Sequence, residues 1–226
     1  MIKIKSENLM KLEKLSILVL LVFIAINAYI QKDSQIALIS AICGITYTFL
    51  AGKGLPICYL FGMTGSGFYS YLAFQNAIWG NLLLYLLYYI PMQITGYFKW
   101  KKHLKSDRSE IVKIKLPTKE LVLLILLLFI LSIIVYVILN YYKDPHPILD
   151  SLTTVFSIGG MYLTVRRAIE QWIFWMFVNA ISFIMWINLA INGAKVYSTI
   201  IMWGAYLFLA VYFYLNWRNE LRGKSL

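Results

Sequence analysis

The sequence predicts an all-α polytopic membrane protein with two parallel three-helix repeats, a linker helix between them and an extra N-terminal helix. Three observations support this fold class. First, of the 226 residues, 61% are hydrophobic and 14% are charged, and the mean hydropathy is +0.71. Second, the charges are segregated, so that residues 54–98 contain none, whereas about 20 apolar residues cross a bilayer as a helix. Third, the sequence contains an internal repeat. Together they exclude a soluble globular domain.

Charge-free runs, broken by Gly, Pro and Asn residues, mark eight candidate spans, at residues 15–31, 35–52, 55–74, 78–98, 121–142, 148–165, 171–191 and 196–217. The longest run must fold at Gln75 and Asn76, because one helix of that length would far exceed a hydrocarbon core of about 30 Å. We therefore expect an N-terminal basic segment and helix, a first three-helix repeat, a basic loop with the linker helix, a second three-helix repeat and a tail, at residues 1–34, 35–98, 99–147, 148–217 and 218–226.

The basic residues favour one orientation of these spans. With the N-terminus inside, only Lys32, Lys143 and Lys195 of the 21 Lys and Arg residues fall outside, which leaves 21 − 3 = 18 inside. The positive-inside rule then places both termini and the loop at residues 99–120 in the cytoplasm. We expect this loop to be a solvated orientation signal, with binding of anionic lipid as the alternative. The net charge of +11 does not indicate a nucleic-acid partner, because the cations lie between apolar runs.

The internal repeat appears when the sequence is shifted by 115 residues, as from Gly44 to Gly159, to 117 residues, as from Trp100 to Trp217. The matches lay residues 35–98 over residues 148–217. Two three-helix units point the same way through a membrane only if an odd helix carries the chain back across, and the span at 121–142 has that role. Parallel repeats are typical of transporters, whose substrate sites lie near the midplane where the repeats meet.

The spans lack the groups that most membrane enzymes and ion-coupled carriers use. No Asp, Glu, Lys, Arg or His lies in a span interior, since Asp150 and Glu170 are at span edges. Hydrolases and proton-coupled carriers need such titratable groups, and no ATP-binding P-loop motif is present. Cys43 and Cys58 have no partner ligands nearby in the sequence and are expected to be buried small hydrophobes. We therefore expect a protein that binds or transports a molecule, with no catalytic residue, metal or cofactor.

Polar and aromatic residues share one face on each of two spans. On the span at 171–191, Trp172, Trp175 and Asn179 follow at helical spacing, and on the span at 78–98 the corresponding residues are Asn81, Tyr89 and Gln93. Amides in hydrocarbon must be hydrogen-bonded, either to a ligand or to a neighbouring helix, and aromatic faces suit a planar, polar and even cationic molecule.

Tryptophans near span ends have a simpler explanation. Trp100, Trp203 and Trp217 are expected to be belt residues at the level of the lipid headgroups.

Two stretches carry a resemblance to a known family. Residues 167–179 read RAIEQWIFWMFVN, with the pattern W-x-x-W-x-x-x-N, and residues 76–100 contain NAIWGN and YIPMQITGYFKW. These stretches resemble the PnuC family of bacterial vitamin transporters, over about residues 36–217.

The resemblance implies a fold, an activity and a site. The fold is two parallel three-helix bundles joined by a linker helix, similar in outline to the SWEET sugar transporters. The activity is uptake of nicotinamide riboside down its gradient across the bacterial inner membrane by a homotrimer, and a cytoplasmic kinase traps the riboside by phosphorylation. Gln93, Trp172, Trp175 and Asn179 would line the site.

Three alternatives remain at this stage. Sister members of the family take thiamine or other vitamins. The second alternative is a substrate-binding membrane subunit that relies on separate ATPase partners, and such a subunit would fail to transport unaided in liposomes. A non-transporting assembly or lipid-modifying protein is disfavoured by the repeat and by the lack of catalytic groups.

Overall fold

The computed structural model describes residues 2–32, 34–75, 82–107, 109–143, 146–191 and 197–223. Within these ranges no β-strand occurs and the chain is mostly helical, which confirms the all-α class. The helices are α1 (Ile2–Gln31), α2 (Gln35–Gly52), α3 (Cys58–Gln75), η1 (Leu84–Tyr89), α5 (Ile90–Lys101), α6 (Thr118–Tyr141), α7 (Pro147–Val165), α8 (Gln171–Ile191) and α9 (Tyr197–Gly223).

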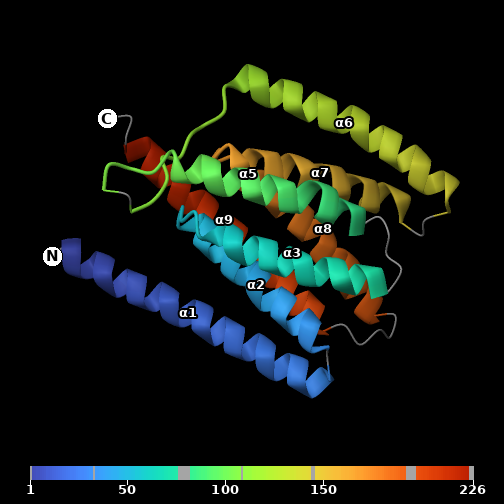
Figure 1. The fold of residues 1–226 in the computed structure, drawn as a ribbon, viewed down its shortest axis with the longest axis horizontal. Helices are drawn as coiled ribbons and strands as arrows, with labels where there is room; N and C mark the ends of the chain where they lie inside the picture. Colours follow the sequence, from blue (N-terminus) through green and yellow to red (C-terminus); the bar gives the residue numbers. More distant parts are fainter. Residues whose placement is uncertain are drawn as a thin grey trace.

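The helices lie side by side in a bundle, with α1 and α6 on its two outer sides (Figure 1). Helix α1 packs against α2 and α9, whereas α6 packs against α7. The N-terminus, the C-terminus and the loop between α5 and α6 all lie at one end of the bundle (Figure 1). An even number of crossings requires this placement of the termini.

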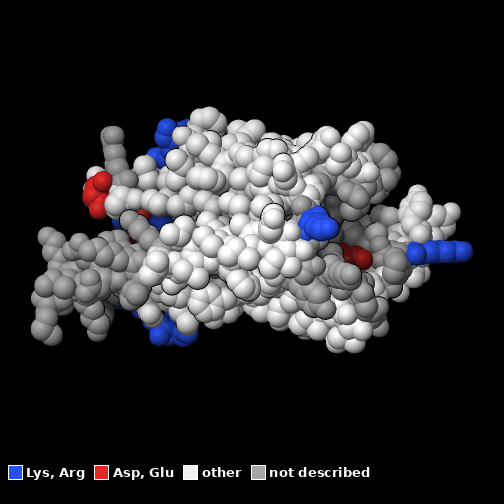
Figure 2. All heavy atoms as spheres, turned by 90° about the horizontal axis from the view of Figure 1, so that it is seen from below, with Lys and Arg blue, Asp and Glu red and all other residues white. Residues whose placement is uncertain are grey.

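Four of the described helical segments are long and apolar enough to cross a membrane, namely Gln35–Gly52, Thr118–Tyr141, Pro147–Val165 and Ile200–Gly223. Shorter apolar stretches lie in α1 and α8, at Leu15–Ile30 and Gln171–Met185. Uncharged side chains cover most of the middle of one face of the molecule, and most Lys, Arg, Asp and Glu atoms lie toward its ends (Figure 2). The eight-span count and the parallel repeats remain predictions.

Two helices are longer than the spans expected from hydropathy. Helix α1 begins at Ile2 rather than near residue 15, because no Gly or Pro interrupts the basic segment before it. The α1 residue Glu13 is paired with Lys53 and accepts a hydrogen bond from the hydroxyl of Tyr212. Helix α9 continues to Gly223 through residues 218–222, four of which are polar. Both extensions lie beyond the apolar stretches, where hydropathy gives no signal of a helix.

The span predicted at 78–98 is described from residue 82 onward and contains a π-helical turn, η1, directly before Pro91. Proline has no N–H to donate and its ring clashes with the carbonyl four residues earlier, so the wider turn accommodates it. The N–H of Ile90 accordingly bonds to the carbonyl of Tyr85, five residues back. The hydroxyl of Tyr88 donates to the carbonyl of Ile158 over 2.7 Å, which fixes η1 against α7. The turn thus sets the direction in which the side chains of Tyr85, Tyr88 and Tyr89 project.

The basic loop after α5 is packed against the bundle, contrary to the expected solvated segment. The N–H of Ile111 donates to the carbonyl of Gly54 over 2.9 Å, which joins the loop to the α2–α3 turn. The N–H of Ile169 donates to the carbonyl of Ile114 over 2.9 Å, which joins the loop to the α7–α8 turn. Glu170, which the sequence places at a span edge, is buried and accepts a hydrogen bond from the N–H of Leu116 over 3.1 Å.

A buried lysine joins this loop to the last helix. Lys113 pairs with Glu110 at 2.7 Å and with Glu220 of α9, and Lys105 pairs with the same two carboxylates. The ammonium of Lys113 also lies 5.2 Å from the ring centroid of Trp217. The sequence shows the charge of the loop but not these partners, because Glu220 is about 110 residues away.

The expectation that Trp100 and Trp217 are belt residues is wrong. Both side chains are fully buried, and Trp217 packs edge-on against Trp172 with the ring centroids 5.6 Å apart. Trp203 is half-buried and lines a cavity among the helices, and its place in the belt stays a prediction. Position near a helix end does not separate the two cases, because a packed bundle end and a headgroup belt both favour large amphipathic rings.

Candidate substrate cavity

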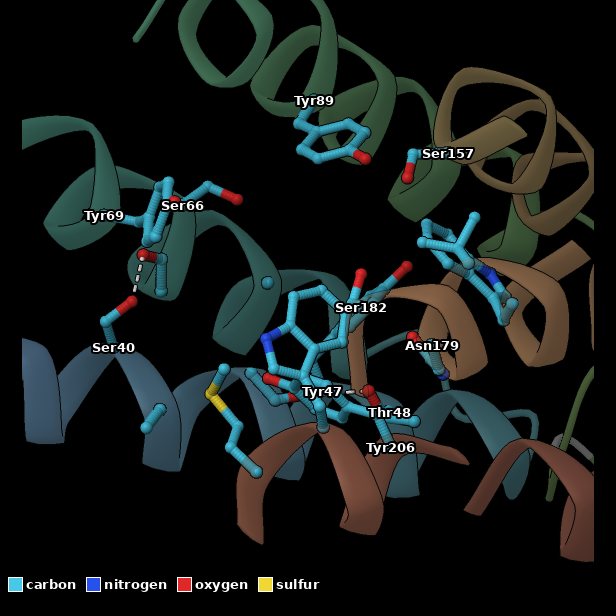
Figure 3. Close-up of a pocket in the computed structure, with 18 of the residues that line it drawn as sticks. Ser40, Tyr47, Thr48, Ser66, Tyr69, Tyr89, Ser157, Asn179, Ser182 and Tyr206 are labelled. Carbon is cyan, nitrogen blue, oxygen red and sulfur yellow. Dashed lines mark hydrogen bonds between the residues drawn. The ribbon is translucent and has the colours of Figure 1, made fainter. Parts of the chain in front are cut away.

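A cavity of about 610 Å³ lies among the helices, within the size range of sites for small molecules. Its walls are formed by α2, α3, η1, α5, α7, α8 and α9, and two α1 residues also contribute. Tyr89 and Ser157 face Tyr47, Thr48 and Tyr206 across the open space (Figure 3). The lining therefore combines aromatic rings with hydroxyl groups from both halves of the chain.

Five of the six residues predicted to bind substrate line this cavity, namely Tyr89, Gln93, Trp172, Trp175 and Asn179. The sixth, Asn81, lies outside the described residues. The five come from two separate parts of the chain, η1 with α5 and α8. The structure thus brings together the two faces that the spacing predicted separately.

Gln93 is held in place by a neighbouring serine. Its side chain is 3% exposed, its Nε2 donates to Ser66 Oγ over 3.1 Å, and Oε1 lies 3.3 Å from the same hydroxyl. Gly62 of α3 makes room for this amide, because a Cβ there would lie 3.1 Å from Gln93 Nε2 and 2.9 Å from the ring of Tyr47. One donor and part of the carbonyl capacity remain for another partner.

The two tryptophans of α8 have different surroundings. Trp172 is nearly fully buried between Phe213 and Trp217, with ring centroids 5.5 and 5.6 Å away, and its Nε1 has no hydrogen-bond partner. Trp175 is half-buried and its Nε1 donates to Thr164 Oγ1 over 3.1 Å. Trp175 is thus the better placed of the two to offer a ring face to a ligand.

Asn179 and Ser182, one turn apart on α8, are both buried and both line the cavity. Figure 3 shows them beside each other on one wall. An amide and a hydroxyl at this spacing present donors and acceptors to the same region. Such a pair suits the hydroxyl groups of a sugar.

The predicted site omitted several lining residues, among them Tyr47, Tyr69, Thr164 and Tyr206. Tyr69 stacks near Tyr85 at a centroid distance of 4.4 Å, so these rings form one aromatic wall with Tyr89. Nothing in their spacing separates them from the many other tyrosines of the chain. Thr48 and Thr164 also line the cavity, and each follows a glycine by four residues, Gly44 and Gly160 respectively. This Gly-x-x-x-Thr spacing is a signal that could have identified the two threonines.

The charges around the cavity are sparse. Among the described residues that line it, none is Lys, Arg or His. Asp150 contributes a carboxylate to the lining. The sequence placed Asp150 at a span edge, and it does lie in the first turn of α7, yet its half-buried side chain also reaches the lining. The cavity is therefore suited to a neutral or cationic molecule rather than to an anion.

The chain matches the family model described as nicotinamide mononucleotide transporter over residues 34–219. It is 32% identical over 214 residues to the nicotinamide riboside transporter PnuC of Neisseria mucosa, covering 91% of this chain and 81% of the relative. It is also 32% identical over 208 residues to the nicotinamide riboside transporter PnuC of Haemophilus influenzae, covering 91% and 89%. It shares a TM-score of 0.79 and 28% identity with the crystal structure of the vitamin B3 transporter PnuC, covering 92% of this chain and 91% of that one.

The helical bundle, its internal cavity and these relatives define the class of the protein, a multi-pass membrane transporter rather than an enzyme. Within that class, the chain belongs to the PnuC family. The resemblance inferred from the tryptophan and asparagine pattern of α8 is thereby confirmed.

Proposed function

We propose that this protein carries nicotinamide riboside across the bacterial inner membrane. The observation that supports this most strongly is the lining of the cavity, where the rings of Tyr89 and Trp175 lie together with the amides of Gln93 and Asn179. Nicotinamide riboside is a planar pyridinium cation with a carboxamide and sugar hydroxyls. Aromatic faces attract such a cation, and amides hydrogen-bond its polar groups.

The riboside is favoured over the mononucleotide named in the family description. A phosphate is bound in proteins by Lys, Arg or groups of backbone N–H donors. The described lining residues include no basic side chain, and Asp150 would repel a phosphate. The relatives from Neisseria mucosa and Haemophilus influenzae carry the name of the riboside as well.

In the proposed site, Trp175 and Tyr89 stack on the pyridinium ring, with Trp172 supporting them from the buried side. Gln93 and Asn179 hydrogen-bond the carboxamide or the ribose, and Asn81 contributes a further amide. The burial of Gln93 and Asn179 supports this assignment, because buried amides that face a cavity need a partner.

Transport in this proposal is facilitated diffusion. An uphill carrier needs a site for the driving ion, typically an intramembrane carboxylate or histidine, and the span interiors contain none. Asp150, at the edge of its span, is the lining residue best suited to bind a driving ion if transport of the riboside were coupled to one. A cytoplasmic kinase traps the riboside, since the phosphorylated product meets a cavity whose described lining has no Lys, Arg or His.

The proposed arrangement in the membrane has both termini and the α5–α6 loop in the cytoplasm, in a homotrimer. The 18 to 3 distribution of Lys and Arg supports the orientation. The trimer rests on the family resemblance alone, and light scattering of the detergent-solubilised protein tests it.

A thermal-shift screen tests the choice of substrate. The detergent-solubilised protein is heated with nicotinamide riboside, nicotinamide mononucleotide, thiamine or riboflavin, since a ligand at 100 times its Kd stabilises the folded state by about 2.7 kcal/mol. We expect the riboside to raise the melting temperature and the mononucleotide to leave it unchanged. A shift with thiamine alone would assign the protein to another vitamin.

A further inference from the structure

The ring of Trp175 rests on two residues of α7 that lie one turn apart. Its Nε1 donates to Thr164 Oγ1 over 3.1 Å. Its ring also lies directly over Gly160, because a Cβ at that position would be 3.1 Å from Trp175 Cε2. Gly160 thus allows the ring to approach the helix backbone, and Thr164 fixes the edge of the ring.

Thr164 is itself fixed on every side. It is 1% exposed, its hydroxyl donates to the carbonyl of Gly160 over 2.8 Å, and its own carbonyl accepts the indole N–H of Trp100 over 2.9 Å. A threonine hydroxyl has one proton, which goes to the Gly160 carbonyl. Its lone pairs are therefore left to accept the proton of Trp175 in a single orientation.

The opposite wall of the cavity carries a related Gly-x-x-x-Thr pair. In α2, Thr48 Oγ1 donates to the carbonyl of Gly44 over 3.0 Å, and a Cβ on Gly44 would lie 2.2 Å from the hydroxyl oxygen of Tyr206. The two Gly-x-x-x-Thr pairs are 116 residues apart, within the shift of the internal repeat. The hydroxyl end of Tyr206 approaches Gly44, as the ring of Trp175 approaches Gly160.

We propose that Thr164 is a positioning residue for substrate binding, which fixes the plane of the Trp175 ring before the ligand enters. This rests on the proposed function, in which Trp175 stacks on a planar cation. Stacking depends on the angle between the rings, and a ring already held at that angle loses less entropy when it binds. Thr164 belongs to the cavity lining, but its hydroxyl is engaged by Gly160 and Trp175, so loss of the hydroxyl frees the indole and weakens binding through Trp175.

The first test compares the affinity of purified variants for nicotinamide riboside by isothermal titration calorimetry. Thr164→Val keeps the shape of the side chain and removes the acceptor, and we expect its Kd to rise roughly 5- to 30-fold. Thr164→Ser keeps the hydroxyl and should bind within about twofold of the wild type. Thr95→Val is the matched control, because Thr95 makes the same bond to a carbonyl four residues back, over 2.9 Å, on an exposed part of α5.

A double-mutant cycle separates positioning from general damage to the fold. In a Trp175→Phe background the indole N–H is absent, so adding Thr164→Val should raise the Kd no further. An equal loss of affinity with and without Trp175→Phe would overturn the proposal, as would wild-type affinity in Thr164→Val.

A second measurement needs no ligand. In a tryptophan-labelled NMR spectrum of the free protein, Trp175→Phe identifies the indole N–H signal of Trp175. Thr164→Val should move this signal upfield and Thr95→Val should not. An unmoved signal would contradict the hydrogen bond from Trp175 to Thr164, whatever the protein transports. A moved signal together with no riboside binding by the wild type would contradict only the proposed function.

Discussion

Trp217, near the end of α9, donates its indole N–H to the carbonyl of Gly52, the last residue of α2, over 2.7 Å. Trp100, at the end of α5, makes the corresponding bond to Thr164, the residue before the last of α7, over 2.9 Å. The Trp217 bond joins the two predicted repeats, and the Trp100 bond joins the end of α5, just after the first repeat, to the second. The two halves are therefore joined at the bundle end where the α5–α6 loop packs, and the cavity lies between them.

Trp217→Phe should destabilise this end of the bundle. The change leaves the Gly52 carbonyl without its donor, and an unpaired buried carbonyl costs about 1 to 3 kcal/mol. The melting temperature in detergent should fall by several degrees, whereas Phe208→Leu, at a side chain that is 69% exposed on the same helix, should leave it nearly unchanged. Equal melting temperatures for Trp217→Phe and the wild type would show that the bond contributes nothing.

Gln93→Ala and Asn179→Ala should each weaken binding of nicotinamide riboside. Each leaves a ligand group unpaired, at a cost of about 1 to 3 kcal/mol, which corresponds to roughly 5- to 150-fold in Kd by calorimetry. Gln75→Ala removes an exposed amide at the end of α3 and serves as the control. Wild-type affinity in both cavity variants would mean that these amides only join helices.

Asp150→Asn should slow the entry of a cationic substrate. Two unit charges about 4 Å apart attract by about 1 kcal/mol in water, so the initial uptake rate should fall by no more than roughly fivefold and lose part of its dependence on salt. Asp107→Asn, at an exposed carboxylate in the α5–α6 loop, is the control. The measurement is initial uptake of labelled riboside at low and high ionic strength. An unchanged rate would exclude a role for this carboxylate in capture.

The orientation is tested by cysteine labelling of intact cells. With Cys43 and Cys58 replaced by Ala, an impermeant maleimide added outside should label His146→Cys, at the exposed start of α7, but not Ser109→Cys, in the exposed part of the α5–α6 loop. Disrupted cells supply the control, since both should then react. Labelling of Ser109→Cys in intact cells would overturn the eight-span scheme.

The sequence predicts most of the helices, because hydropathy and the presence of charge-free runs are local properties of the chain. Helix α2 coincides with its expected span, and α8 begins and ends where predicted. The π-turn before Pro91 and the packed α5–α6 loop were not predicted. The loop depends on partners such as Gly54 and Glu220, which are distant in sequence and leave no periodic pattern.

The candidate site divides in the same way. Trp175 and Asn179 were identified because their spacing and residue type stand out on one helix. Thr164 and Tyr206 were not, because threonine and tyrosine are common in this chain and their roles come from packing between helices. Spacing along one helix therefore predicts lining residues on that helix, whereas residues whose role comes from packing between helices require the three-dimensional structure.

Transport in liposomes that contain only this protein tests the central claim most directly. Labelled nicotinamide riboside should equilibrate to equal concentrations inside and outside, and an imposed pH or sodium gradient should leave that endpoint unchanged. Net accumulation should appear only when a riboside kinase and ATP are enclosed, because the phosphorylated product cannot return through the cavity. Accumulation above equilibrium driven by either ion gradient, with no kinase present, would contradict uncoupled facilitation, and no entry of the riboside at all would contradict the proposed function.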